Sequence, residues 1–142
     1  MPDVRAPADI ESVLIAYLKT DGAVTALVPA SRISAELRRQ FSAEETYLQL
    51  FRTGGAPDGD DIPGHLDQPS IQINAFGGDR AEAWDLTAEV IRALTQAPAA
   101  THDGAVITRA ARILGPFWSP DPDTDAPRYI FGFTFTVHPS AS

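Results

Sequence analysis

The sequence contains no cysteine, so neither a disulfide framework nor a metal site built on thiolates is possible. It also has no hydrophobic run near the roughly 20 residues that a helix needs to cross a bilayer. The first residues, Met1 to Arg5, lack the apolar core of a signal peptide, and we expect synthesis in a reducing cytoplasm. A chain of 142 residues has the size of one domain with one core, and we expect a single domain over residues 1–142.

Basic residues are absent from two segments that hold most of the acidic charge. Residues 53–67 contain four aspartates and residues 119–127 contain three, so these segments carry seven of the eight net negative charges. Acidic loops repel a phosphate backbone, because its binding depends on Lys and Arg side chains that displace counterions. We therefore do not expect tight nucleic-acid binding. The closest-spaced aspartates are Asp58, Asp60 and Asp61 in the first segment and Asp121, Asp123 and Asp125 in the second.

Two segments predict amphipathic helices. Asp9 is a suitable N-cap for the first, in which apolar residues recur at the spacing of one helical face until Asp21-Gly22. The second is predicted from about Asp79 to Ala97, and Asp79 and Glu82 have the spacing of a capping box. We expect its line of Trp84, Ala88, Ile91 and Leu94 to pack against a sheet, with Ala83, Leu86 and Val90 beside it.

Five segments have the composition or the two-residue alternation of β-strands: residues 32–37, 46–51, 70–76, 105–114 and 129–138. Together with the two helices they predict an α+β fold, with a mixed, mainly antiparallel sheet of four to five strands and both helices packed on one face. Gly, Pro and Asp predict a flexible acidic loop at residues 53–68, and the C-terminal tail is expected to fray. In the last strand, the alternate residues Tyr129, Phe131, Phe133, Phe135 and Val137 are expected in the core.

The glycine pair Gly77-Gly78 between a strand and a helix invites comparison with phosphate-binding loops. A dinucleotide fingerprint needs G-x-G-x-x-G and a P-loop ends in Gly-Lys-Ser/Thr, and neither pattern is present. Asp79 and Glu82 also place carboxylates at the helix N-terminus, where a phosphate would bind. The pattern favours a strand-to-helix turn.

No motif assigns a catalytic residue, a cofactor or a metal. The repeat at Asp121 resembles the start of a calcium loop, but an EF-hand needs Gly and Glu where this chain has Ala126 and Gly132. No H-E-x-x-H zinc motif and no G-x-S-x-G nucleophile motif occurs. The three histidines lie in separate segments, at His65, His102 and His138.

Four segments, spread over nearly the whole chain, resemble the tail terminator (tail completion) proteins of long-tailed bacteriophages. They are the first helix from Asp9 to Leu18, the turn LKTDGAVTALVPASRIS, the strand PSIQINAFGG before the second helix, and the closing strand DAPRYIFGFTFTV. The resemblance implies a structural subunit, not an enzyme, that forms a ring, a hexamer, on the head-proximal end of the tail tube. Such a ring ends tube polymerisation and joins the tail to the head-side connector, at the tail-neck junction of a virion assembled in the host cytoplasm.

Three alternatives remain open at this point. Another neck or head-completion ring protein would share these features. A small-molecule-binding domain would show a ligand-sized apolar pocket with converging polar groups. A hydrolase would show two titratable residues with perturbed pKa values in one cleft.

A ring would repeat each charged cluster around its axis. DNA would pass through it without specific binding, and we expect one acidic cluster to face the lumen. The other is expected to meet basic residues of a neighbouring subunit or partner. The candidate basic residues are Arg38 and Arg39, or Arg109 and Arg112.

Overall fold

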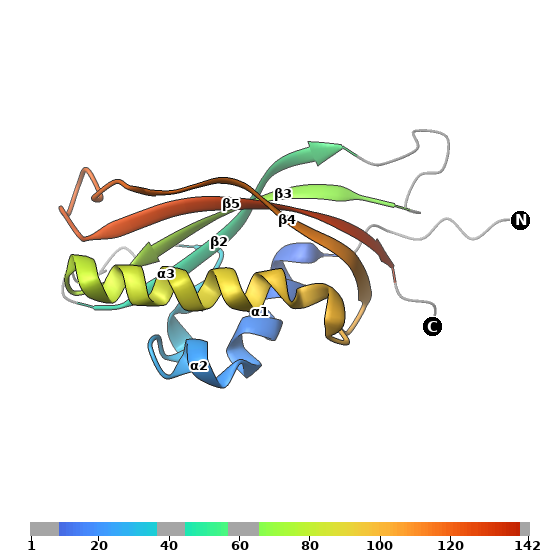
Figure 1. Ribbon diagram of the computed structural model, residues 1–142, viewed down its shortest axis with the longest axis horizontal. Helices are drawn as coiled ribbons and strands as arrows, with labels where there is room; N and C mark the ends of the chain where they lie inside the picture. The colour runs from blue at the N-terminus through green and yellow to red at the C-terminus, as the bar shows by residue number, and fades with distance from the viewer. Residues whose placement is uncertain (1–8, 37–44, 57–65, 140–142) are drawn as a thin grey trace, which may run out of the picture.

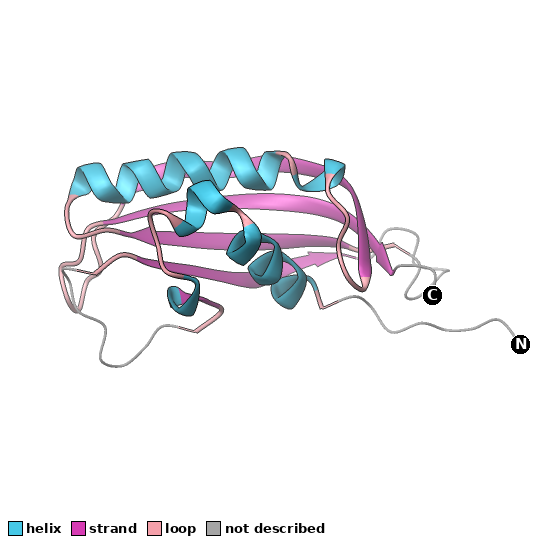
Figure 2. Ribbon diagram, turned by 90° about the horizontal axis from the view of Figure 1, so that it is seen from below, coloured by secondary structure: helices cyan, strands magenta, loops and turns pink. Residues whose placement is uncertain are grey.

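The structure is a computed structural model that describes residues 9–36, 45–56 and 66–139. All helices lie on one face of a single sheet (Figures 1 and 2). The helices are α1 (Ile10–Thr20), α2 (Gly22–Thr25) and α3 (Arg80–Thr95), with the 3-10 turns η1 (Ala30–Arg32) and η2 (Ala97–Ala99). The strands are β1 (Ile33–Ser34), β2 (Tyr47–Ala56), β3 (Gln68–Phe76), β4 (Ala105–Trp118) and β5 (Arg128–Pro139).

The sheet has the order β1-β2-β3-β5-β4, and only the β1-β2 pair is parallel. The predicted α+β class, with a mainly antiparallel mixed sheet, is therefore confirmed. β1 and β4 form opposite edges of the sheet. β1 pairs through only two residues, Ile33 and Ser34, whereas β4 pairs with β5 along most of its length.

The core lies between the sheet and the helices. Phe131, Phe133 and Phe135 are fully buried, as the two-residue alternation of the last strand predicts. Leu14 and Leu18 of α1 belong to the same cluster. Burial of a large apolar side chain contributes about 1.5–3 kcal/mol, so this row is a main source of stability.

The opposite sheet face is covered by no helix among the described residues, and its centre is polar. Gln49 and Asn74 are register partners on this face, and the Asn74 side-chain amide donates to Gln49 Oε1 at 2.9 Å. The Gln72 amide donates in turn to Asn74 Oδ1 at 3.1 Å. Because these amides satisfy one another, the buried Asn74 side chain is not left without a hydrogen bond.

Both helix starts are capped as the sequence predicts. The Asp9 side chain accepts from the Ser12 amide, and the Asp79 side chain accepts from the Glu82 amide at 2.8 Å. The return bond of the second cap differs from the standard box, because Glu82 Oε2 accepts from the amide of Gly78 and not from that of Asp79.

The prediction of which residues of α3 pack on the sheet is wrong in part. Trp84 is 47% exposed and Ala88 is exposed, while Ile91 is half-buried and Leu94 is buried. The face that packs on the sheet contains residues expected beside the line, together with Thr87, whose hydroxyl donates to the Ala83 carbonyl. Apolar residues cover so wide an arc of this helix that the periodicity alone does not select which part of the arc packs. The buried residues are Ala83, Leu86, Thr87, Val90, Ala93 and Leu94.

Several strand limits also differ from those predicted. The first strand is reduced to Ile33–Ser34, because η1 occupies the residues before it, and β4 continues four residues beyond Leu114. The irregular segment expected at residues 53–68 is shorter at both ends, since β2 runs to Ala56 and β3 starts at Gln68. Two Arg52–Asp67 hydrogen bonds, of 2.7 and 2.8 Å, and the Asp67–Val137 bridge hold this end together. Residues 57–65 lie outside the described residues.

Candidate interaction surfaces

The glycine corner between β3 and α3 is a steric requirement of the fold. A Cβ atom on Gly77 would lie 2.4 Å from the Ala83 amide nitrogen, a distance at which the helix start has to move. The Gly77 amide donates to the Pro127 carbonyl, which ties the corner to the start of β5. The positive end of the helix is satisfied by Asp79 and Glu82. The corner thus has the geometry of a strand-to-helix turn.

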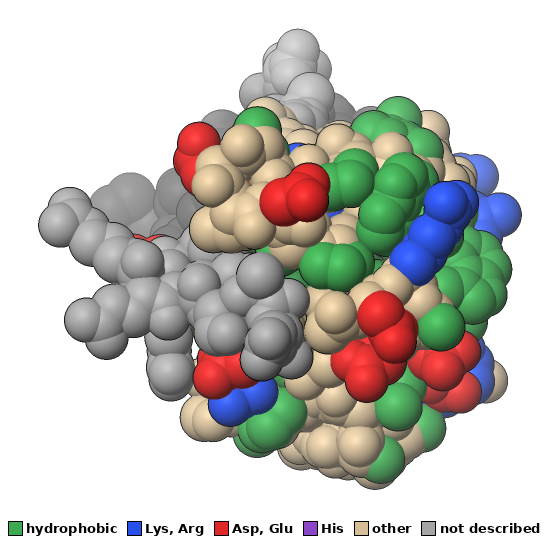
Figure 3. Space-filling view, turned by 90° about the vertical axis from the view of Figure 1, so that its left-hand side faces the viewer, with side chains coloured by type: hydrophobic (Ala, Val, Ile, Leu, Met, Phe, Trp, Pro, Cys, Tyr) green, Lys and Arg blue, Asp and Glu red, His purple; other side chains and the backbone are tan. Residues whose placement is uncertain are grey.

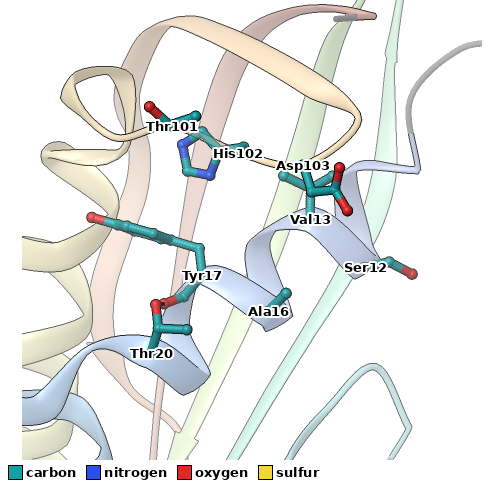
Figure 4. A pocket seen from close by; sticks show the side chains of 8 residues that line it. All are labelled: Ser12, Val13, Ala16, Tyr17, Thr20, Thr101, His102 and Asp103. Atoms are coloured by element: carbon teal, nitrogen blue, oxygen red, sulfur yellow. Dashed lines mark hydrogen bonds between the residues drawn. The ribbon is translucent and has the colours of Figure 1, made fainter. Parts of the chain in front are cut away.

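A cavity of about 380 Å³ opens between α1 and the segment before β4 (Figure 4). Its two most reactive groups are already engaged by the fold. His102 Nε2 lies 2.7 Å from the Ala97 carbonyl oxygen, and the Tyr17 hydroxyl donates to the Ala93 carbonyl oxygen at 2.7 Å. Burial, with a contribution from Asp21, raises the pKa of Tyr17 above its ordinary value. The lining residues are Ser12, Val13, Ala16, Tyr17, Thr20, Thr101, His102 and Asp103.

Tyr17 and His102 do not form a nucleophile–base pair in this cavity, because their rings meet edge-on at 5.0 Å and both polar ends bond to backbone. The Ser12 hydroxyl donates to the N-cap carboxylate of Asp9 at 2.8 Å and so takes part in the helix cap. His138 lies elsewhere, half-buried on β5, and His65 lies outside the described residues. Within residues 9–36, 45–56 and 66–139, no three His, Asp or Glu side chains converge as a metal site requires. In the same ranges no helix has the length and apolar content of a membrane span.

The second acidic cluster lies in the hairpin between β4 and β5. The Asp121 carboxylate makes its contacts within the hairpin. It accepts hydrogen bonds from the Thr124 amide and hydroxyl, and it lies 3.7 Å from the Arg128 guanidinium. Burial raises the pKa of Asp121, but these hydrogen bonds and Arg128 outweigh that effect and lower it overall. Asp123 and Asp125 are exposed at the tip. The hairpin therefore presents two of its three predicted carboxylates to solvent.

The other predicted charged residues fall into two groups. Asp58, Asp60, Asp61, Arg38 and Arg39 lie outside the described residues. Arg109 and Arg112 are exposed on the edge strand β4, and no carboxylate of the described residues pairs with either.

An aromatic cluster at the end of the molecule was not predicted from the sequence. The Arg80 guanidinium lies 4.6 Å from the centre of the Trp118 ring, and its Nε donates to the Tyr129 hydroxyl at 3.0 Å. Trp84 and Trp118 both meet the Tyr129 ring edge-on, with centroids 5.3 Å apart. Figure 3 views this end, where hydrophobic and basic side chains lie together with acidic side chains next to them.

Exposed apolar residues continue from this cluster along β4. Ile113, Leu114 and Phe117 are 57%, 46% and 44% exposed. They interrupt the two-residue alternation of β4, because the β4-β5 register shifts between Arg112 and Leu114 and again between Leu114 and Phe117. We call the five residues Arg109, Arg112, Ile113, Leu114 and Phe117 the β4 patch.

Comparison with known proteins identifies the family of this chain. The family model described as "Tail completion protein gp17" matches residues 12–138, which include nearly all of the described fold. The chain belongs to this family of phage tail completion proteins. The resemblance stated from the sequence is thereby confirmed, and the protein is a structural tail protein.

A solved structure described as "Virion of native gene transfer agent (GTA) particle" contains a chain of the same fold. The two chains superpose with a TM-score of 0.66 at 17% sequence identity, over 92% of this chain and 95% of the other. No curated protein sequence matches this tail completion protein.

Sequence reasoning found Arg109 and Arg112 but missed the apolar part of the β4 patch and the cluster around Trp84. The cluster is assembled from α3, β4 and β5, so it cannot be predicted from the spacing of residues within one segment. A signal was present in β4, where Ile113-Leu114 and Phe117-Trp118 are adjacent apolar pairs. Such pairs put one large apolar side chain on each face of a strand and leave one of the two exposed unless both faces are covered.

Proposed function

We propose that this tail completion protein is the subunit of a ring, a hexamer, that caps the head-proximal end of the tail tube. The ring ends tube polymerisation and joins the tail to the head-side connector, at the tail-neck junction of a virion assembled in the host cytoplasm. The observation that carries this proposal is the family match over residues 12–138, because it covers nearly the whole fold and not one motif. The GTA virion chain supports it through a shared fold.

The proposed role is structural, without catalysis and without a cofactor. The described cavity supports this reading, because the Tyr17 hydroxyl and the His102 ring nitrogen that border it are bonded to backbone carbonyls. We propose that the partners are identical subunits, the tail tube protein and a head-side neck protein. DNA passes through the ring without specific contacts.

The acidic clusters have a proposed role in that passage. One cluster, of Asp58, Asp60 and Asp61 or of Asp123 and Asp125 beside Asp121, faces the lumen and repels the duplex. Screening limits this repulsion to about 8 Å at physiological salt, so the cluster has to lie close to the path of the DNA. The other cluster contacts basic residues of a neighbour or partner, with Arg38 and Arg39 or Arg109 and Arg112 as candidates.

Removal of the protein from the virus or particle that encodes it tests the role. Electron microscopy of the resulting lysate should show tail tubes of uncontrolled length that are not attached to heads, and a plasmid copy should restore normal particles. Complete infectious particles in its absence would contradict the proposal.

The same images separate the second candidate, another ring of the neck or head. Loss of a neck or head-completion protein would leave tails of normal length beside unjoined heads. Tube length therefore distinguishes termination of the tube from closure of the head.

A further inference from the structure

The exposed large apolar side chains of the described residues lie mostly on one edge strand of the sheet. Four of the five belong to β4, and the fifth is Trp84 of α3. Exposed apolar side chains that lie close together, as Ile113, Leu114 and Phe117 do on this strand, commonly mark interaction sites. The residues are Trp84, Val106, Ile113, Leu114 and Phe117.

Helix geometry places Trp84 toward the same edge of the sheet. Successive residues of α3 are about 100° apart around its axis. Ala93, whose carbonyl accepts a hydrogen bond from the Tyr17 hydroxyl of α1, therefore lies on one flank of α3. The other flank contains Arg80, Trp84 and Ile91. The second flank meets the end of β4, since Arg80 lies over Trp118. The flank of α3 that faces away from α1 thus borders the β4 edge.

The β4 patch is suited to contacts by side chains rather than to pairing with another strand. The β4-β5 register shifts at three points, and such irregularities, together with exposed charges, oppose the addition of a partner strand. The Leu114 side chain packs on the backbone of Gly132 in β5, since a Cβ atom added to Gly132 would lie 3.3 Å from the Cβ of Leu114. Ile113 and Phe117 are exposed beside this contact.

The charge of the β4 patch is uncompensated. β4 contains Arg109 and Arg112 and no Asp or Glu, and no described carboxylate pairs with either arginine. Arginine and aromatic residues are enriched at protein interfaces, and the patch has both in Arg109, Arg112 and Phe117. The partner surface is therefore expected to be acidic.

The opposite edge of the same sheet offers exposed carboxylates. Residues 9–56, which include α1, α2, β1 and β2, contain six Asp or Glu residues and five Lys or Arg residues, so the net charge of the segment is only −1 and the complementarity rests on two single carboxylates. Glu36, just beyond the edge strand β1, is exposed, and its carboxylate has no described cation partner. Asp9 is exposed at the start of α1, and α1 packs against both β1 and β2.

We propose that the β4 patch of one subunit binds the β1-α1 edge of a second copy of this chain, where Asp9 and Glu36 are exposed. A head-to-tail contact needs two different surfaces on each subunit, and the sheet order places these two at its opposite edges. The assignment rests on the proposed ring, and it adds which surfaces of the subunit meet.

The absence of native cysteine allows a direct test by cross-linking. The variant Ile113→Cys/Glu36→Cys carries one thiol in the β4 patch and one on the opposite edge, both at exposed positions. Assembled wild-type-like particles that contain it are treated with a short bismaleimide and analysed on a denaturing gel. A ladder of covalent oligomers is expected from the pair, and each single-cysteine variant should remain a monomer.

Two cross-linking results would overturn the inference. A dimer from Ile113→Cys alone would mean that two β4 patches face each other across a two-fold axis. Monomers only, from a double variant that is present in particles, would mean that the two edges do not meet. The gel reports contact between copies wherever the assembly sits in the particle, so this failure is distinguishable from failure of the proposed location.

A charge change tests the electrostatic part of the proposal. Arg112→Glu should lower incorporation into particles by about tenfold or more, because like charges then face each other across the contact. The matched control is the charge swap Arg112→Glu/Glu36→Arg, which should restore incorporation to within about twofold of wild type, because opposite charges then face each other again. Both variants should keep the wild-type thermal midpoint. Equal incorporation of Arg112→Glu and wild type would overturn the charge pairing.

Discussion

Replacement of Trp84 by Ala tests the packing of α3, because the sequence pattern and the structure assign this residue to different environments. The cost of emptying a fully buried Trp site is about 3–5 kcal/mol. Trp84 is 47% exposed and meets Tyr129 edge-on at 5.3 Å, so its removal loses part of the burial and one aromatic contact. An exposed site leaves no enclosed cavity, and we expect a cost of about 1–2 kcal/mol.

Leu86→Ala is the matched control on the same helix. Leu86 is fully buried, and its truncation should cost about 3–5 kcal/mol. For a chain of this length, 1 kcal/mol shifts the thermal midpoint by about 3–4 °C, so the two variants should differ by several degrees. Far-UV circular dichroism is the suitable assay, since Trp84→Ala removes one of two fluorescent tryptophans. A midpoint for Trp84→Ala as low as that for Leu86→Ala would refute the helix orientation.

Three further predictions concern the turn, the acid response and the acidic loop. Gly77→Ala should destabilise by about 3 kcal/mol or more, because its Cβ would meet the Ala83 amide, whereas Gly22→Ala, with open space around it, should be nearly neutral in the same melting assay. Burial raises the pKa of Asp21, but the hydrogen bonds that its carboxylate accepts from Arg92, Val24 and Ala23 outweigh burial and lower the pKa overall. The ionised Asp21 side chain therefore stabilises the fold above the unfolded pKa of about 3.9. This stabilisation is lost as the pH falls through the lower pKa of the folded state. The gap in thermal midpoint between wild type and Asp21→Asn should accordingly be wide at about pH 7 and narrow at about pH 2.5, and an equal gap at both values would contradict the assignment. Replacement of Asp58, Asp60 and Asp61 by Asn should impair either joining of tails to heads or DNA ejection, and normal values of both would leave the loop a solubilising role only.

Features set by local chemistry were predictable from the sequence. Asp9 and Asp79 cap their helices as expected, because a carboxylate at the N-cap satisfies free amides without help from the rest of the fold. The alternating row of Phe131, Phe133 and Phe135 is buried as expected, because a strand with one covered face has a period of two. The strand-to-helix turn at Gly77-Gly78 was expected because Asp79 and Glu82 occupy the helix N-terminus, whereas the steric need for glycine at position 77 is visible only in the structure.

Features set by tertiary packing were not predictable in the same way. α3 has apolar residues over a wide arc, and contact with both the sheet and α1 decides that Leu86 is buried and Trp84 is exposed. Bulges in β4 break the alternation that would have assigned Ile113 and Phe117 to a face. The charged residues, in contrast, were found as single residues, and only the fold shows that Arg109 and Arg112 share an edge strand.

The position of this protein in the intact particle is the most direct test of the account. A copy with a C-terminal tag, shown to complement loss of the wild-type protein, is labelled with gold and imaged by electron microscopy. The account predicts label only at the junction of head and tail. Label along the tube, on the head shell or at the distal tail tip would contradict the proposed role.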